Sequence, residues 1–148
     1  MDTTANQQTE DHERPSPPAF AYAKLPAQDV DRARAFWREH FGLEPYVENH
    51  HHLYYEIGGA HFLVFPSTGA PAGTHDQLGL VVADLESEVA RLRSQGLTFE
   101  VFPAPPGPGT TMTNGIMDRG YMKAGWFKDT EGNLISINEF SGGSPFHR

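Results

Sequence analysis

Histidine side chains are the first residues of this 148-residue chain that suggest chemistry. Three of them stand together as His50-His51-His52, and His61 opens a predicted strand, His61–Phe65. Alternate residues of a strand face opposite sides, so His50 and His52 can converge on a metal ion while His51 points away. Two ligands make a weak site, and a solvated hairpin loop explains the same residues. His61 is the better acid or base, because imidazole exchanges its proton near neutral pH; a hydrogen-bonded histidine lining an apolar pocket is the alternative.

Aromatic side chains give a second signal. Predicted strands carry Tyr22, Tyr54, Tyr55, Phe62, Phe65, Tyr121, Trp126 and Phe127. Strand alternation turns about half of them toward one face, where a cup of aromatic and few polar groups is a site for a small molecule. Core packing accounts for the other half. Met112, Met117 and Met122 lie in or beside a predicted mobile loop, Pro103–Gly120, where adaptable side chains suit a lid over an apolar ligand.

Composition excludes several classes of protein. The formal net charge is −8, and no basic stripe is present, which argues against nucleic acid or an anionic membrane as a partner. The chain has no cysteine, so disulfides, thiolate metal sites and a cysteine nucleophile are excluded. We find neither a long apolar run nor a secretory signal, and a cytoplasmic location is expected by default. Gly-rich phosphate loops and a nucleophile elbow are also missing.

The elements that must position these residues form an internal repeat. Asp29 and Asp84 are predicted helix N-caps, 55 positions apart, and the Gly-Leu pairs that end the two helices begin at Gly42 and Gly96, 54 positions apart. Predicted strands surround each helix: Phe20–Leu25, Leu43–Glu48, Leu53–Ile57 and His61–Phe65 in the first half, then Gln77–Val82, Leu97–Phe102, Tyr121–Lys128 and Leu134–Phe140. Asp129-Thr130-Glu131-Gly132-Asn133 joins the last two as a hairpin.

The sequence therefore predicts an α+β fold in which two βαβββ modules pair around a cleft. One domain covers residues 20–140, with modules at 20–66 and 76–140. Residues 1–19 are expected to be a disordered tail, and residues 141–148 a C-terminal tail.

This order of elements resembles the vicinal oxygen chelate superfamily, which includes glyoxalases, bleomycin-resistance proteins and extradiol dioxygenases. Three segments carry the resemblance: LPAQDVDRARAFWREHFGLEP at 25–45, LGLVVADLESEVARLRSQGL at 78–97 and WFKDTEGNLISI at 126–137. Thr130 stands where the family usually has proline in the last segment. The resemblance implies the fold but not the activity, because the superfamily combines isomerases, dioxygenases, transferases, epimerases and drug-binding proteins.

The resemblance also implies where metal ligands would stand. The four positions fall on Tyr22, Leu63, Gln77 and Ser136, which do not form a divalent-metal set. A shift of register at Gln77 by one or two residues would bring in Asp76 or His75. We therefore expect no metal and no other cofactor.

Two main functions remain open. The first is a binding protein, a homodimer as the resemblance implies, that takes a small aromatic or planar organic molecule. Its expected ligand-binding residues are Tyr22, Lys24, Tyr54, His61, Leu63, Phe65, Gln77, Met122, Trp126, Ser136 and Asn138. The second is a metal-independent isomerase or cyclase acting on a carbonyl compound, in which His61 moves the proton and Tyr22 or Gln77 holds the oxyanion. A metal-dependent lyase or dioxygenase with atypical ligands, from His75 or the His50–His52 loop, is a third and weaker alternative.

Overall fold

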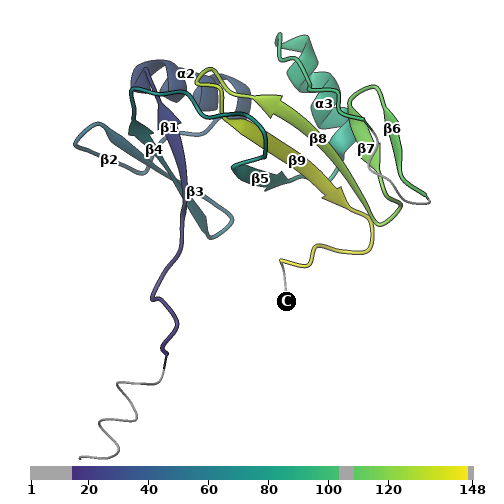
Figure 1. Cartoon of the computed structure of the whole chain (residues 1–148), viewed down its shortest axis with the longest axis horizontal. Coiled ribbons are helices and arrows are strands. Elements are labelled where there is room, and N and C mark those ends of the chain that lie inside the picture. The colour runs from purple at the N-terminus through teal and green to yellow at the C-terminus, as the bar shows by residue number, and fades with distance from the viewer. Residues whose placement is uncertain (1–14, 104–108, 147–148) are drawn as a thin grey trace, which may run out of the picture.

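The computed structural model describes residues 15–103 and 109–146. These residues form two helices and two β-sheets, and both helices lie on the same side of the sheets (Figure 1). No helix among the described residues is long and apolar enough to cross a membrane. Residues 1–14 of the tail expected at 1–19 lie outside the described part of the chain.

The first module is a four-stranded sheet with one helix. It contains β1 (Ala23–Ala27), α2 (Val30–Phe41), β2 (Val47–Asn49), β3 (His52–Ile57) and β4 (Ala60–Pro66). The strand order is β1-β4-β3-β2, with β1 parallel to β4 and the other neighbours antiparallel. This is the predicted βαβββ module.

The second module repeats that plan with one more strand. It contains β5 (Leu78–Val81), α3 (Leu85–Ser94), β6 (Thr111–Thr113), β7 (Ile116–Asp118), β8 (Met122–Lys128) and β9 (Leu134–Phe140). The strand order is β5-β9-β8-β7-β6, and β5 runs parallel to β9 as β1 does to β4. The predicted α+β class and internal repeat are therefore confirmed.

Both helices begin and end where the sequence predicts. The side chains of Asp29 and Asp84 accept hydrogen bonds from the backbone N–H groups of Arg32 and Ser87, three residues ahead. Gly42 ends α2 in the left-handed region with φ of 64°, where a glycine avoids the strain that a Cβ would add.

One hydrophobic core unites the two modules. Phe41 of α2 stacks on Phe127 of β8, with ring centroids 5.8 Å apart, and Trp37 packs against Phe62 of β4. Tyr55 is fully buried in the same core, and burial raises its pKa to about 12, so its hydroxyl stays protonated. Because strand side chains alternate, the sheet faces that turn away from the helices carry the other residues of each strand. We call these the open faces.

The structure corrects two predictions in the second module. The predicted strand Leu97–Phe102 is reduced to an isolated bridge between Phe99 and Phe127, because the Phe99 ring packs into space left by Gly125, where a Cβ would lie 3.2 Å from that ring. The predicted loop Pro103–Gly120 contains the β6–β7 hairpin. Its turn is Asn114-Gly115, with φ of 56° and 81°, the two positive values of a type I′ turn.

Two predicted strand boundaries also shift. The first strand is not Phe20–Leu25, because β1 begins at Ala23 and continues through Pro26. Proline is tolerated there because β1 pairs only with β4 and is an edge strand, so no ladder donor is lost. The second strand starts at Val47 rather than Leu43.

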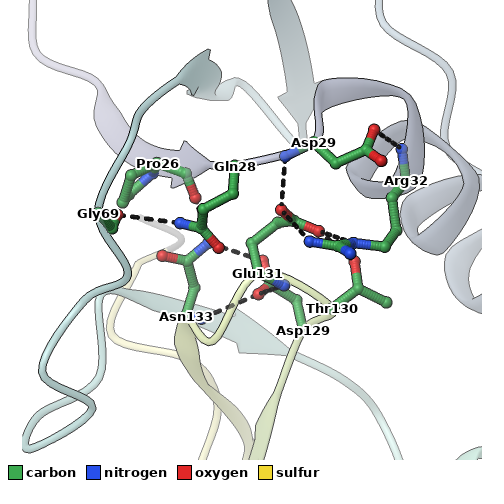
Figure 2. A network of polar contacts seen from close by, with 9 residues as sticks. All are labelled: Pro26, Gln28, Asp29, Arg32, Gly69, Asp129, Thr130, Glu131 and Asn133. Carbon is green, nitrogen blue, oxygen red and sulfur yellow. Dashed lines mark hydrogen bonds and ion pairs between the residues drawn. The ribbon is translucent and has the colours of Figure 1, made fainter.

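A buried carboxylate joins the last hairpin of the second module to the first helix (Figure 2). The Glu131 side chain is fully buried, and it accepts hydrogen bonds from the Asp29 backbone N–H at 2.9 Å and from Arg32 Nε at 2.7 Å. Burial alone would raise the pKa of Glu131. The hydrogen bonds from Arg32, Asp29 and Thr130, with the charge of Arg32, outweigh burial and lower that pKa.

The neighbouring residues of this hairpin hold it in shape. Asp129 accepts from the backbone N–H groups of Glu131 and Asn133 and from the Asn133 side chain. The Asn133 amide also donates to the carbonyl oxygen of Pro26 in β1, at 3.0 Å (Figure 2). Burial raises the pKa of Asp129 despite these donors. The predicted hairpin is thus confirmed, and it fixes the relative position of the two modules.

We predict that Glu131→Gln destabilises the fold by about 2 kcal/mol at pH 7, measured by urea unfolding, because it removes a charge-assisted buried contact. Because the pKa of Glu131 is lower in the folded state than its ordinary value of 4.5, the ionised side chain stabilises the fold. This stabilisation is complete above pH 4.5 and is lost as pH falls through the folded-state pKa. The difference between wild type and variant should therefore shrink below pH 4.5. The raised pKa of Asp129 gives stability the opposite pH dependence. Asp129 is present in both proteins, so its contribution largely cancels when the two stabilities are compared.

Glu86→Gln is the matched control, because Glu86 forms an exposed ion pair with Lys123 and should change stability little. A difference for Glu131→Gln that stays constant down to pH 3, or one no larger than the control's, would contradict this account.

Candidate functional site

The predicted ligand-binding residues separate into two groups on the two open faces. Lys24, Tyr54, His61, Leu63 and Phe65 belong to the first sheet, where β1, β3 and β4 are paired in register. Met122, Trp126, Ser136 and Asn138 belong to β8 and β9 of the second sheet, and Gln77 lies directly before β5. Tyr22 precedes β1 and is 52% exposed.

A cavity of about 370 Å³ opens on the second open face. Its wall is apolar and consists of Phe102, Pro103, Met112, Met117, Trp126 and Leu134. Its polar lining consists of Thr74, His75, Asp76 and Arg119. Of the eleven residues predicted to bind a ligand, Trp126 lines this cavity. Asp76 and His75, the neighbours of Gln77 that a register shift would bring in, line it as well.

Local sequence explains how the wall is built. The Asn114-Gly115 turn brings Met112 of β6 opposite Met117 of β7, and Met117 pairs with Ala124 of β8. The small alanine side chain leaves room beside Trp126, and the Phe102 ring stands edge-on to Trp126 with centroids 5.5 Å apart. The methionines therefore form part of a sheet, where the sequence predicted a loop lid.

Sequence reasoning did not single out Phe102 or Arg119. The Asn-Gly dipeptide is the signal that would have found the hairpin, since it is the strongest short-range sign of a type I′ turn. Once the hairpin is recognised, Arg119 is seen to lie in the connection between β7 and β8. Its backbone N–H donates there to the Met122 carbonyl oxygen at 2.9 Å. No local signal marks Phe102, whose role depends on the bridge at Phe99.

The first open face is occupied by contacts among its own residues. His61 Nδ1 lies 3.0 Å from the Tyr46 hydroxyl, and the imidazole packs edge-on against Phe20 and Tyr46. The Lys24 ammonium lies 4.8 Å from the centroid of the Phe65 ring, a cation–π geometry. Both side chains therefore have partners within the protein: His61 contacts the Tyr46 hydroxyl, and Lys24 lies against an aromatic ring.

A second cavity, of about 340 Å³, lies where the modules meet. His61 and Phe62 of β4 line it from the first module, and Leu80 and Val81 of β5 line it from the second. Phe146, after β9, also contributes. His61 is the one member of the predicted binding set that reaches this cavity.

The four positions that the family resemblance assigned to metal ligands do not fit a divalent metal. Leu63 is buried and has no donor atom, and Tyr22 lies off the sheet. Ser136 Oγ accepts a hydrogen bond from Asn138 Nδ2, which also donates to the Leu80 carbonyl. Gln77 Oε1 is buried without a partner among the described residues, but a lone amide oxygen does not hold such an ion. Within residues 15–103 and 109–146, no group of three or more His, Asp or Glu side chains is placed to bind a metal.

His50 and His51 form the turn between β2 and β3, and His52 is the first residue of β3. His50 and His51 have φ of 54° and 64°, and the His52 ring nitrogen Nδ1 donates to the His50 carbonyl oxygen at 2.8 Å. His50 and His51 are exposed. These features match the solvated hairpin that the sequence left open as one alternative.

Comparison with known proteins identifies the superfamily of this chain. The family model of the Glyoxalase/Bleomycin resistance protein/Dioxygenase superfamily matches residues 19–137. No curated protein matches the chain.

Solved structures share the fold at low sequence identity. The fosfomycin resistance protein FosX from Listeria monocytogenes is 13% identical, with a TM-score of 0.66 over 90% of this chain and 100% of that one. A glyoxalase/bleomycin resistance protein/dioxygenase from Nocardioides is 16% identical, with a TM-score of 0.63 over 98% and 99% of the two chains. Lactoylglutathione lyase from Agrobacterium tumefaciens is 20% identical, with a TM-score of 0.58 over 84% and 96%. The chain belongs to the glyoxalase/bleomycin resistance protein/dioxygenase superfamily.

Proposed function

We propose that this protein binds a small aromatic or planar organic molecule in the cavity on its second open face, without a resident metal. The observation that carries the proposal is the apolar wall, where Phe102 stands edge-on to Trp126 and Met112 and Met117 lie beside them. Flat rings pack well against aromatic and thioether groups. The volume of about 370 Å³ lies within the range of small-molecule sites.

The comparisons support a binding function only at the level of the family. The matched family includes resistance proteins by its description, and FosX is a fosfomycin resistance protein. At 13% identity the likeness concerns the fold, so fosfomycin is not transferred to this chain. The proposal rests instead on the cavity and on the poor fit of Leu63 and Ser136 to a metal.

We also propose that two copies associate through the first open face. Phe20, Tyr46 and Val47 are 62%, 56% and 47% exposed, and the first two meet at His61. Exposed apolar groups gathered in one place are a feature of association surfaces. A second copy of the chain is the occupant that the family relationship favours. A cytoplasmic location stays a prediction from composition.

Binding of the neutral dye N-phenyl-1-naphthylamine tests the cavity. We predict that Trp126→Ala and Phe102→Ala each weaken dye affinity by about fivefold or more, because each removes aromatic surface from the wall. Dye fluorescence during titration gives the affinity. Val101→Ala is the matched control, since Val101 is 75% exposed and does not line the cavity. Equal affinities for all four proteins would contradict the proposal.

Light scattering after size-exclusion chromatography tests the dimer. We predict a mass of twice 16.4 kDa for the wild type and a shift toward 16.4 kDa for Tyr46→Asp, which places a charge in the apolar patch. Ala90→Asp, on the exposed side of α3, should stay dimeric. A monomeric wild type, or a Tyr46→Asp protein that remains dimeric at micromolar concentration, would rule out this surface.

A second candidate function is metal-independent acid–base chemistry in the cavity between the modules. It is favoured by the contact between His61 and Tyr46 at the edge of that cavity. We predict for this function that the protein accelerates exchange of the α-hydrogens of 1-indanone with D₂O, followed by proton NMR. His61→Ala should abolish the acceleration and His52→Ala should not. Exchange no faster than in buffer would exclude this function and leave the binding protein.

A further inference from the structure

We infer that the ligand of the second open face is an aromatic acid whose anionic group is held by Arg119 and whose far end donates a hydrogen bond to Asp76. This inference rests on the proposed binding function and specifies the chemical class of the ligand. Its basis is the separation of opposite charges at the two ends of an apolar cavity.

Arg119 brings a positive charge to the cavity without a counterion of its own. Its backbone N–H donates to the Met122 carbonyl oxygen, which holds the residue in the β7–β8 connection, next to the first residue of β8. In the described part of the chain, no carboxylate lies within 4.0 Å of the Arg119 guanidinium. The nearest carboxylate in sequence, Asp118, accepts a hydrogen bond from the Gly120 backbone N–H and lines the pocket on the helix side of the sheet.

A guanidinium at the edge of an apolar wall suits a carboxylate. It presents a planar fork of donors that match the two oxygens of a carboxylate, and it is more weakly hydrated than an ammonium group. Trp126, Phe102 and Met117 line the same cavity as Arg119, and a charge pair beside an apolar wall attracts more strongly than one surrounded by water. The net charge of −8 repels anions from the molecule as a whole, so a local positive charge is needed for an acid to bind.

The opposite end of the cavity carries a negative charge. Asp76 belongs to the segment before β5, and the next residue, Gln77, donates its backbone N–H to the Leu134 carbonyl oxygen. Leu134 pairs with Lys128, the last residue of β8. Asp76 and Arg119 therefore approach from opposite ends of β8, with Trp126 between them. A carboxylate at Asp76 disfavours a second acidic group there and accepts from a hydroxyl or amino group.

The probes that test this class are 6-hydroxy-2-naphthoate and its neutral amide, 6-hydroxy-2-naphthamide, titrated into the full-length protein by calorimetry. We expect the acid to bind at least about tenfold more tightly than the amide, a preference that shrinks when salt is raised. Arg119→Ala should remove this preference by weakening the acid and leaving the amide within about twofold. Arg38→Ala, at an exposed arginine on α2, should change neither affinity.

Each outcome separates the inference from the function on which it rests. If the acid and the amide bind equally well, or if Arg119→Ala weakens both equally, the assignment of an acid is wrong while the cavity remains a binding site. If neither probe binds and the neutral dye also fails, the proposed function is wrong and the inference falls with it. 2-Naphthoate lacks the hydroxyl and should bind several-fold more weakly than 6-hydroxy-2-naphthoate to the wild type. The two acids should bind equally well to Asp76→Ala, which removes the acceptor. Equal binding of the two acids to the wild type would overturn the role of Asp76.

Discussion

Glu131 of the last hairpin makes a buried contact with the first turn of α2, and this contact joins the two modules. It places a carboxylate from the second module against the backbone N–H of Asp29 and the guanidinium of Arg32 in the first. A negative charge is favoured there because a helix N-terminus carries partial positive charge. With Asn133 bound to Pro26 nearby, the contact fixes both modules around one core. Each sheet then has one face covered by a helix and one face left open.

The two open faces differ although the modules are repeats. On the first, His61 is engaged with Tyr46 and Lys24 lies over Phe65. On the second, small residues such as Ala124 and the extra hairpin leave a hollow beside Trp126. The two open faces of the repeated fold therefore differ in the contacts that their own side chains make.

Local signals explain which features the sequence could predict. Helix caps at Asp29 and Asp84 and the final hairpin depend on neighbouring residues, and all three are found in the structure. The strand predicted at Leu97–Phe102 failed because Phe99 turns its ring into space above Gly125, a tertiary effect that no local pattern contains. The sequence linked Trp126, Met112 and Met117 to a ligand, and all three line the cavity. It did not single out Arg119, which reaches the cavity from the connection between β7 and β8.

The most direct test of the central claim, a binding site that works without metal, is the affinity for a neutral aromatic ligand with and without metal ions. The protein would carry His50, His51 and His52 replaced by alanine, so that adventitious binding at the exposed turn is removed. Affinity would be measured after exhaustive chelation and again with Mn(II), Ni(II), Zn(II) or Fe(II). We expect dissociation constants that agree within about twofold. An affinity that appears only with a stoichiometric metal, or improves about tenfold or more, would contradict this expectation.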